Sequence, residues 1–292
     1  MPPFSYPDSP TPDQLIEAIK PLPPTARVLS RLQQLLSDPN SGLDDISTLL
    51  RLDAPLVTRV IHVSNSIVFR RGEATRTIEE AVNRIGFREI YRLVAVIAAQ
   101  AISSGPMPAY GMSGEQVWEE SVACALAAEH VANHLNEDGS VAYTVGLLRA
   151  IGRRPINQYL ITKDAAKVLN NDGYPNETVG AEIAVLGYSH AEVAAALLKK
   201  WDFPAGTVFP VRHQFAPLSA GPDHETMASI LMAARLLAAK LITREEPPVA
   251  DDEADVLGVL RINRGDLTDM LPRLSVSMER ARQITGALKS VR

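Results

Sequence analysis

Cysteine is almost absent from this chain, and so are several other features that would point directly to a function. Cys124 is the single cysteine among 292 residues, which excludes a disulfide framework and a thiolate metal cluster. Aromatic residues make up 5% of the chain and leave few platforms for stacking on single strands or sugars. No apolar run approaches the roughly 20 residues of a membrane span, and the start lacks the segments of a signal peptide. We expect a cytoplasmic protein with no membrane partner.

The motifs of nucleotide-binding and hydrolytic enzymes are missing as well. The chain has no G-x-x-x-x-G-K, no strand followed by G-x-G-x-x-G, no H-E-x-x-H and no G-x-S-x-G, so these sites are not expected. The formal net charge of −5 argues against a whole-protein nucleic-acid surface. The length and the 46% apolar content suit one or two ordinary globular domains.

What the chain does contain is helical periodicity along most of its length. The clearest case is a long helix that begins after Ser113, where apolar or small residues recur at helical spacing and define one buried face: Val117, Ser121, Cys124, Ala128, Val131 and Leu135. No alternating strand pattern of useful length and no fixed-period repeat is present. The sequence therefore predicts an all-α fold.

Breaks in this periodicity predict the organisation of the chain. Residues 1–12 are rich in proline and are expected to form a flexible arm, followed by a helical subdomain over 13–105. The Ser-Ser-Gly-Pro-Met-Pro stretch at 103–108 is the best domain boundary. A second helical lobe is predicted over 110–217, and a helical extension over 218–292 is expected to pack on it. Further helices are predicted over 43–52, 55–67, 78–86, 87–103, 140–150, 154–161, 163–170, 176–186, 189–201, 223–243 and 264–287.

Histidines are the remaining candidates for metal chemistry. His130 and His134 are four residues apart on the long helix, a spacing that lets two imidazoles reach one metal. Both lie more than roughly 100° from the buried face at 100° per residue, which favours a solvated surface over a metal site. His190, beside a helix cap, and His213, after Arg212, each favour a structural role.

Arginine is concentrated in residues 51–92, which hold eight arginines against five acidic residues. Arg88 and Arg92 are one turn apart on one predicted helix, and Arg70 and Arg71 lie in the loop before it. Guanidinium groups suit phosphate or carboxylate partners. The simpler interpretation is a solvated helix face with local ion pairs such as Glu89 to Arg92. The alternative is a patch that binds an anion or docks a protein.

Several stretches together resemble one family. They are the L-P-P-T opening at residue 22, the Asp53–Ser66 segment with its terminal Asn-Ser, and the run from Ile78 to Glu89 (IEEAVNRIGFRE). VWEESVACALAAEHVA, YTVGLLRAIG and YSHAEVAAALLKKWDFP…VRHQFAP follow in order. Over roughly residues 20–217 the chain resembles an HDOD domain, a relative of HD-type metal phosphohydrolases. The resemblance implies an N-terminal helical bundle followed by an HD-like lobe, and a bacterial regulatory role.

The resemblance also implies the loss of the metal site. An active HD enzyme carries a His-Asp pair within G-L-L-H-D-I-G, and the corresponding residues here are Arg149 and Ala150. The earlier family histidine corresponds most nearly to Glu120, and only His190 and His213 fall at positions of family histidines. We expect a vestigial pocket of these five residues that holds no metal or other cofactor, since a divalent cation wants three or more ligands and Arg149 is itself a cation.

The leading hypothesis is a non-catalytic bacterial signal-transduction protein that acts by binding a protein partner in a signalling pathway. A phosphate-bearing small ligand is a second possible partner, with Arg149 as its anchor. The candidate anion-binding or partner-binding residues are Arg70, Arg71, Arg88, Arg92 and Arg149. One alternative is a metal-dependent phosphohydrolase with a rearranged site that uses His130, His134, His190 and His213. The other is a DNA-binding regulator that uses the arginine-rich helix, although nucleic acid is not the expected partner.

Overall fold

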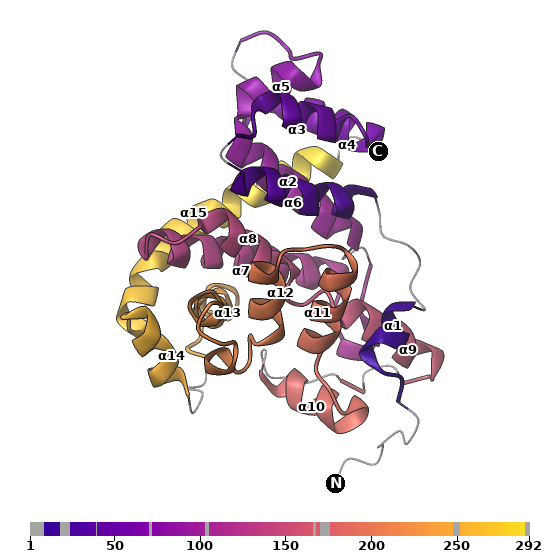
Figure 1. The fold of residues 1–292 in the computed structure, drawn as a ribbon, viewed down its shortest axis with the longest axis vertical. Coiled ribbons are helices and arrows are strands. Elements are labelled where there is room, and N and C mark those ends of the chain that lie inside the picture. Colours follow the sequence, from indigo (N-terminus) through magenta and orange to yellow (C-terminus); the bar gives the residue numbers. More distant parts are fainter. Residues whose placement is uncertain are drawn as a thin grey trace. The chain divides into compact units, whose positions relative to one another are not determined.

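The computed structural model is built from helices throughout the part of the chain that it describes (Figure 1). The described residues are 9–17, 24–38, 40–69, 72–102, 105–165, 168–169, 176–247 and 252–289. Within these ranges the extended structure is limited to an isolated bridge between Met107 and Met112. The predicted all-α fold class is confirmed.

The chain divides into two compact units. The large unit comprises residues 1–21 and 102–274, and the small unit comprises residues 22–101 and 275–292. The chain passes between the units at Ala101 and Ile102, close to the predicted boundary at 105. Two segments differ from the prediction: residues 13–21 belong to the large unit, and residues 275–292 belong to the small unit rather than to the HD-like lobe.

The small unit contains five helices among its described residues, together with the end of α15 (Arg264–Lys289). They are α2 (Pro24–Ser37), α3 (Leu43–Leu50), α4 (Ala54–Ser64), α5 (Ile78–Ile85) and α6 (Phe87–Ile102). Side-chain caps begin two of them, because the Asp53 carboxylate accepts from the Leu56 amide (3.0 Å) and the Thr77 hydroxyl accepts from the Glu80 amide (3.2 Å). Leu32, Leu50 and Val60 are fully buried in its core.

Asn65 connects α4 to the segment that precedes α5. Its amide nitrogen donates to the carbonyls of Ile61 (3.1 Å) and Thr75 (2.9 Å), and its Oδ1 accepts from the Thr75 amide (2.8 Å). Arg84 of α5 donates to the same Oδ1 at 3.5 Å. The asparagine of the Asn-Ser motif therefore has a structural function, since it fixes the return of the chain from α4 to α5.

The large unit surrounds α13 (Glu225–Thr243), which Figure 1 shows nearly end-on. α13 packs on α7 (Gly114–His134), α8 (Gly139–Leu148), α12 (Ala205–Arg212) and α14 (Glu253–Leu260). The remaining elements are α1 (Pro12–Glu17), α9 (Arg153–Thr162), α10 (Asn176–Leu186), α11 (His190–Lys200), the 3₁₀ helices η1 (Pro108–Tyr110) and η2 (Pro217–Ser219), and the start of α15. α7 is buried on nearly all sides and not on one face alone, since Glu120, Val122 and Ala125 are buried with the predicted face.

Two sequence expectations for the large unit are wrong. No helix covers the described part of 163–170: α9 ends at Thr162, Asp164 adopts a φ of 53°, and the Leu169 amide donates to the Ala109 carbonyl at 2.9 Å. Residues 9–12 are not a loose arm, because the Ser9 hydroxyl donates to the Val185 carbonyl and α1 begins at Pro12. Residues 1–8 of the predicted arm lie outside the described residues.

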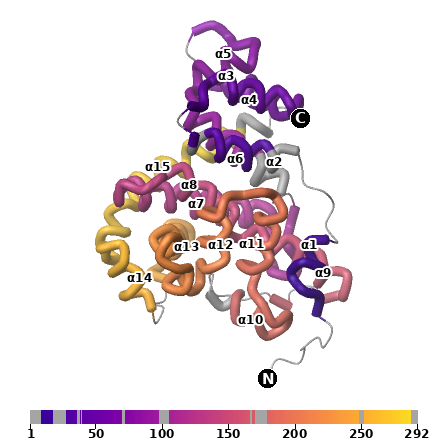
Figure 2. The backbone as a smooth tube through the Cα atoms, in the orientation of Figure 1, coloured from indigo at the N-terminus to yellow at the C-terminus, as the bar shows by residue number. Residues whose placement is uncertain are grey.

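α12 and α14 were not predicted from the sequence. Each has eight residues, and α12 contains Pro210, so neither offers the long periodic pattern on which the other assignments depend. α10 and α11 meet at 81° (Figure 2). Gly187 provides the turn between them with a φ of 86°, a region that side chains with a Cβ rarely adopt.

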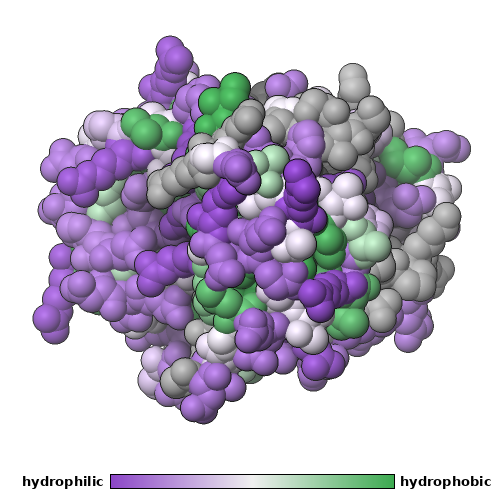
Figure 3. All heavy atoms as spheres, turned by 90° about the horizontal axis from the view of Figure 1, so that it is seen from above, coloured by the Kyte–Doolittle hydropathy of each residue, from purple (hydrophilic) through white to green (hydrophobic). Residues whose placement is uncertain are grey.

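α13 is, taken singly, the one helix in the described part of the chain long and apolar enough to cross a membrane. Its most apolar window has a mean hydropathy of 1.5, and 61% of that window is buried. Core helices of soluble proteins pass the same test, and α13 packs on four other helices. On the face of the molecule that Figure 3 shows, apolar residues form small separated groups among hydrophilic ones.

Candidate functional site

A buried carboxylate paired with two arginines lies where the resemblance places metal ligands. Glu120 of α7 is 5% exposed, Arg149 at the end of α8 is 1% exposed and Arg153 at the start of α9 is 3% exposed. Glu120 accepts hydrogen bonds from Arg153 at 2.9 and 3.1 Å and also from Arg149. Burial favours a raised pKa for Glu120, but the charges of Arg153 and Arg149 and their hydrogen bonds lower it to about 2. Glu120 is therefore ionised at neutral pH.

A second buried carboxylate holds His190. Glu182 of α10 accepts from the Tyr110 hydroxyl (2.7 Å), from the His190 amide (2.7 Å) and from His190 Nδ1 (2.8 Å). Glu182 and His190 are both fully buried. Burial opposes the charge on Glu182, but His190 and Arg153 keep its pKa below the usual value. Because an ionised carboxylate only accepts, Nδ1 of His190 carries the proton in this contact.

His190 itself is a neutral imidazole in this environment. Burial lowers its pKa, and the charges of Arg153 and Arg149 act in the same direction, while Glu182 opposes them. Burial and the neighbouring Glu182 also raise the pKa of Tyr110, which keeps its phenol protonated. Two guanidinium groups, those of Arg149 and Arg153, thus lie in the same buried region as the two carboxylates of Glu120 and Glu182.

Arg153 joins the two carboxylate groups into one network. Its guanidinium lies 5.6 Å from the centre of the Tyr110 ring while it binds Glu120, a distance compatible with a cation–π contact. We call this network the buried ionic cluster: Tyr110, Glu120, Arg149, Arg153, Glu182 and His190. Its members come from η1, α7, α9, α10, α11 and the end of α8, so the cluster joins six elements of the large unit.

Gln214 and Arg235 enclose the Arg149 side of the cluster. The Gln214 amide nitrogen donates to the carbonyls of Arg149 (2.9 Å) and Val211 (3.0 Å), and Arg235 of α13 donates to the Gln214 carbonyl at 2.7 Å. The Arg235 guanidinium also lies 4.1 Å from the centre of the Phe215 ring, which contacts His190 edge-on at 5.3 Å. Gln214 and Arg235 are themselves buried, so the Arg149 side of the cluster is enclosed by buried residues.

Two glycines allow the cluster to assemble. A Cβ at Gly146 would lie 2.6 Å from the Cys124 carbonyl oxygen, and one at Gly152 would lie 2.1 Å from the His190 carbonyl oxygen. Both contacts are with backbone, which cannot move aside cheaply. The glycines of the G-L-L-x-x-I-G stretch therefore permit α8 to approach α7 and the turn before α9 to approach α11.

The structure brings together part of the predicted pocket. Glu120, Arg149 and His190 belong to the cluster, and Ala150 lies in the same turn as Arg149 but is partly exposed. His213 does not join them: it caps the end of α12 and stacks on Phe209 at 6.4 Å. Partial burial, Arg212 and His224 lower its pKa, and no residue of the cluster contributes to that shift.

Arg153, Glu182 and Tyr110 were missed by the sequence reasoning. Arg153 follows Arg149 at the i, i+4 spacing, and this spacing was the available signal. Glu182 and Tyr110 are 72 residues apart in the chain. No local pattern marks such a contact, so only the fold could place them together.

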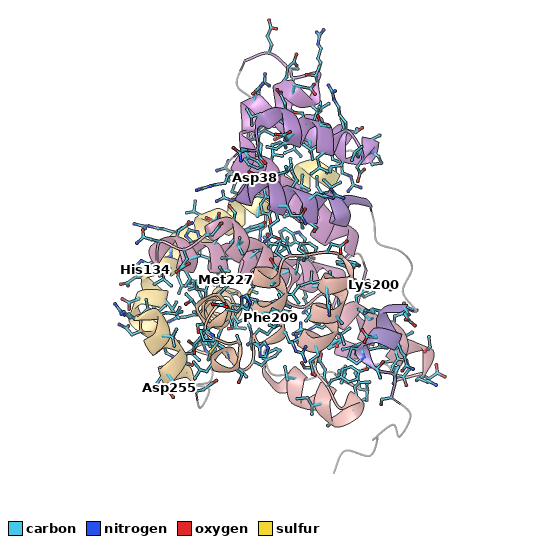
Figure 4. The ribbon with its side chains drawn as sticks, in the orientation of Figure 1. Asp38, His134, Lys200, Phe209, Met227 and Asp255 are labelled. Atoms are coloured by element: carbon cyan, nitrogen blue, oxygen red, sulfur yellow. The ribbon has the colours of Figure 1, made fainter. Side chains whose placement is uncertain are left out.

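His130 and His134 line a separate cavity. Its volume is about 380 Å³, and its wall includes Asp266, Asp269 and Arg273 of α15. His134 is exposed, as predicted, and Figure 4 shows it away from Phe209, the ring on which His213 stacks. His190 and His213 do not line this cavity, and the described residues contain no group of three or more His, Cys, Asp or Glu side chains that could hold a metal, so the four histidines are not brought together in one site.

The predicted arginine patch is described only in part. Arg88 of α6 is exposed, whereas Arg92 is paired with Glu89, the local ion pair that the sequence predicted. Arg280 of α15 also approaches Glu89, at 3.6 Å. Arg70 and Arg71 lie outside the described residues. Arg149 belongs to the large unit and is not part of this surface.

Comparison with known proteins decides the family. The sequence profile of the HDOD domain matches residues 22–217, more than half of the chain. This chain belongs to the HDOD family. A curated relative, an uncharacterized protein of Treponema pallidum (strain Nichols), is 24% identical over 233 residues, which cover 76% of this chain and 44% of the relative. The HDOD chain thus spans less than half of that relative's length.

Solved structures share the fold of this HDOD protein. A protein of Marinobacter aquaeolei VT8 named for signal transduction matches with a TM-score of 0.72 and 20% identity, covering 95% of this chain and 61% of that one. An HDOD domain protein of unknown function from Geobacter sulfurreducens matches with a TM-score of 0.68 and 19% identity, covering 92% and 95%. A protein of Shewanella amazonensis SB2B named as a phosphohydrolase matches with a TM-score of 0.65 and 23% identity, covering 95% and 99%. Identities this low show a common fold.

The residues of this HDOD protein do not fit the metal centre of HD enzymes. Arg149 stands in the ligand position, and its guanidinium pairs with the Glu120 carboxylate. Across the described ranges, no group of three or more His, Cys, Asp or Glu side chains is placed to hold a metal ion. The arrangement is a buried network of ion pairs between arginines and carboxylates.

Proposed function

We propose that this HDOD protein regulates a signalling pathway by binding a protein partner and does not hydrolyse a substrate. The observation that carries the proposal is the position of Arg149. Its guanidinium is buried against Glu120 in the place where an HD enzyme needs metal ligands. A permanent cation there repels a divalent ion and occupies the carboxylate that would otherwise bind it.

The same contacts argue against Arg149 as an anchor for a phosphate-bearing ligand. Arg149 is 1% exposed and Arg153 is 3% exposed, and both bind Glu120. An incoming anion would have to displace a buried carboxylate, which leaves an uncompensated charge in the interior. We therefore propose that binding takes place on the protein surface and not at Arg149.

The small unit supplies the candidate surface. Arg88 is exposed on α6, and Arg59 is exposed on α4. Arginine is enriched in protein interfaces and binds carboxylates in a planar, two-pronged geometry. An acidic region of a protein partner is the chemistry that each of these exposed arginines fits. The name of the Marinobacter neighbour, which refers to signal transduction, agrees with such a role, whereas the Shewanella neighbour is named as a phosphohydrolase.

Catalysis is tested with the full chain and manganese or iron. We expect no turnover of cyclic dinucleotides or of a generic aryl phosphodiester above the rate of metal alone. A Glu120→Gln variant serves as the reference, because it alters the only cluster carboxylate bound to both arginines. Turnover that follows the wild-type protein through purification and disappears in this variant would contradict the proposal.

Partner binding is tested by affinity capture from a bacterial lysate with Arg88→Glu. We expect a captured protein to be lost on this charge reversal. Arg261→Glu is the matched control, since Arg261 is exposed on the large unit. A partner captured equally by all three proteins would remove the arginine surface from the proposal.

A further inference from the structure

The cavity between α7 and α15 is lined by charged and titratable side chains that the buried ionic cluster does not use. Its volume is about 380 Å³, which lies within the range of about 300–1,000 Å³ that is typical of pockets for small molecules. Its wall includes two residues of α7 and four of α15: His130, His134, Asp266, Asp269, Met270 and Arg273. All six belong to the large unit, so the cavity is formed within that unit.

Helical spacing explains why these residues share one cavity. The two histidines are four residues apart on α7, and positions 266, 269, 270 and 273 follow the i, i+3, i+4, i+7 pattern of one face of α15. At 1.5 Å per residue, Arg273 lies about 6 Å beyond Asp269 along the axis of α15. A negative and a positive group are therefore placed one turn apart on the same wall.

Asp269 and Arg273 both have side chains that are available to a ligand. An acidic residue four positions before an arginine commonly pairs with it on a helix, but in the part of the chain that the structure describes neither side chain forms an ion pair or a hydrogen bond. Both residues are exposed, so the cavity is open to solvent. Asp266 differs, because its carboxylate accepts from the Asn263 amide at 2.8 Å at the start of α15.

The other lining residues add an apolar contact and a hydrogen-bonding group. Met270 is 9% exposed, and its flexible thioether adapts to aliphatic partners. His134, at the end of α7 (Figure 4), is exposed, and its imidazole can donate or accept a hydrogen bond. The cavity thus combines one carboxylate, one guanidinium, an apolar side chain between them in the sequence, and an imidazole on the facing helix.

We propose that this cavity binds a small zwitterion, a molecule with an ammonium group and a carboxylate joined by a short aliphatic chain. Asp269 binds the ammonium group, and Arg273 binds the carboxylate through its planar, two-pronged guanidinium. Met270 contacts the methylene groups between the two charges. A ligand with only one of the charges leaves Asp269 or Arg273 without a partner. The inference does not depend on the proposed binding of a protein partner.

Titration with amino acids of increasing length tests the site in the full chain. Glycine, γ-aminobutyrate and ε-aminocaproate are added at neutral pH, and the imidazole signals are followed by nitrogen–proton correlation NMR. At least one of the three should shift the signals of His130 and His134 saturably, because both histidines line the cavity. The signals of His190, which is buried outside the cavity, should not move.

Ligands with a single charge test whether both ends are recognised. Hexylamine lacks the carboxylate of ε-aminocaproate, and hexanoate lacks its ammonium group. Each should bind at least about tenfold more weakly than the best zwitterion, because one charge-assisted contact is lost. Equal binding of either compound would overturn the proposal.

Substitutions assign the two ends. Asp269→Asn and Arg273→Gln should each weaken binding of the best zwitterion at least about tenfold. Asp255→Asn is the matched control, because Asp255 is exposed on α14 and does not line the cavity, and it should leave binding unchanged. Circular dichroism reports the fold of each variant, and all three changes are at exposed positions. The proposal is overturned if none of the three amino acids binds saturably, or if both cavity variants bind as the wild type does.

Discussion

Glu120 is 5% exposed between Arg149 and Arg153, so its ionisation is coupled to the stability of the large unit. Burial opposes its charge, but the two arginines keep its folded-state pKa near 2, below the ordinary 4.5. A carboxyl whose pKa falls on folding stabilises the native state above the unfolded-state pKa, and this contribution is lost as the pH drops toward the folded-state pKa.

The pH dependence of the unfolding free energy follows from this lowered pKa of Glu120. At pH 7 the ionised Glu120 contributes about 3 kcal/mol relative to its protonated form, and this contribution should decline between about pH 5 and pH 2. Urea unfolding as a function of pH measures it. The difference in unfolding free energy between wild type and Glu120→Gln should shrink through that window, and a difference that stays constant with pH would contradict the assignment.

Removing the charge of Glu120 should be costly at neutral pH. Glu120→Gln leaves Arg149 and Arg153 buried without their shared counter-charge, and breaking a buried pair in this way costs about 3–5 kcal/mol. Glu115→Gln in the exposed first turn of the same helix is the control, with an expected loss below about 1 kcal/mol. Equal effects in the two variants would show that the cluster is not a structural core.

At the scale of elements, the turn between α8 and α9 requires glycine. Gly152→Ala would place a Cβ 2.1 Å from the His190 carbonyl oxygen and 2.6 Å from the Ala194 nitrogen. Since both atoms are backbone, we expect a loss of about 3 kcal/mol or more in thermal or urea unfolding. Gly180→Ala in α10 is the matched control, because nothing lies within 4 Å of its Cβ. It should stabilise by up to about 1 kcal/mol, and similar losses in both would contradict the packing.

The connection from α4 to α5 depends on Asn65. Asn65→Ala removes hydrogen bonds to Ile61, Thr75 and Arg84 and leaves partly buried backbone groups without them, at a cost of about 2 kcal/mol. The exposed Asn83 of α5 is the control, and Asn83→Ala should change stability by less than about 0.5 kcal/mol. Hydrogen exchange at the Thr75 amide, which donates to Asn65, should rise in the first variant alone.

Long periodic helices and their caps could be predicted from the sequence. The helices on which the short elements pack could not be predicted from it. α7 and α13 can be predicted because many apolar residues recur in them at helical spacing. Thr77 and Ser113 are recognisable as helix starts because their side chains accept hydrogen bonds from backbone amides three residues further on. α1 also has a local start signal, but its partner helices α9 and α11 lie more than 130 residues further along the chain. Its packing on these helices is a contact between segments far apart in the sequence, and no local sequence pattern predicts it.

The candidate site shows the same limit. The substitution at Arg149 and Ala150 is visible in the sequence, and it predicts the loss of the metal pair. The replacement network is not visible, because Arg153, Glu182 and Tyr110 acquire their roles through contacts across 33 to 72 residues. His213 was expected in the same pocket, but it lies at the end of α12 and outside the cluster. The expectation was wrong because α12, the short helix that positions His213, was not predicted.

At the scale of the whole molecule, the two units differ in the charged groups that they contain. The large unit has a buried ionic cluster that joins six helical elements, and the small unit has an exposed arginine on α6. The N-terminal helix and the end of α15 each belong to a unit that is distant in sequence. We therefore propose that the core of the large unit serves stability and that binding takes place at surfaces.

The central claim is that arginine–carboxylate pairing has replaced metal binding, and metal retention tests it most directly. The full chain is produced with added manganese and iron, dialysed, and measured by inductively coupled plasma mass spectrometry beside His190→Ala. We predict substoichiometric metal in both proteins, with no difference between them. One or more equivalents retained by the wild type and lost in His190→Ala would contradict the account.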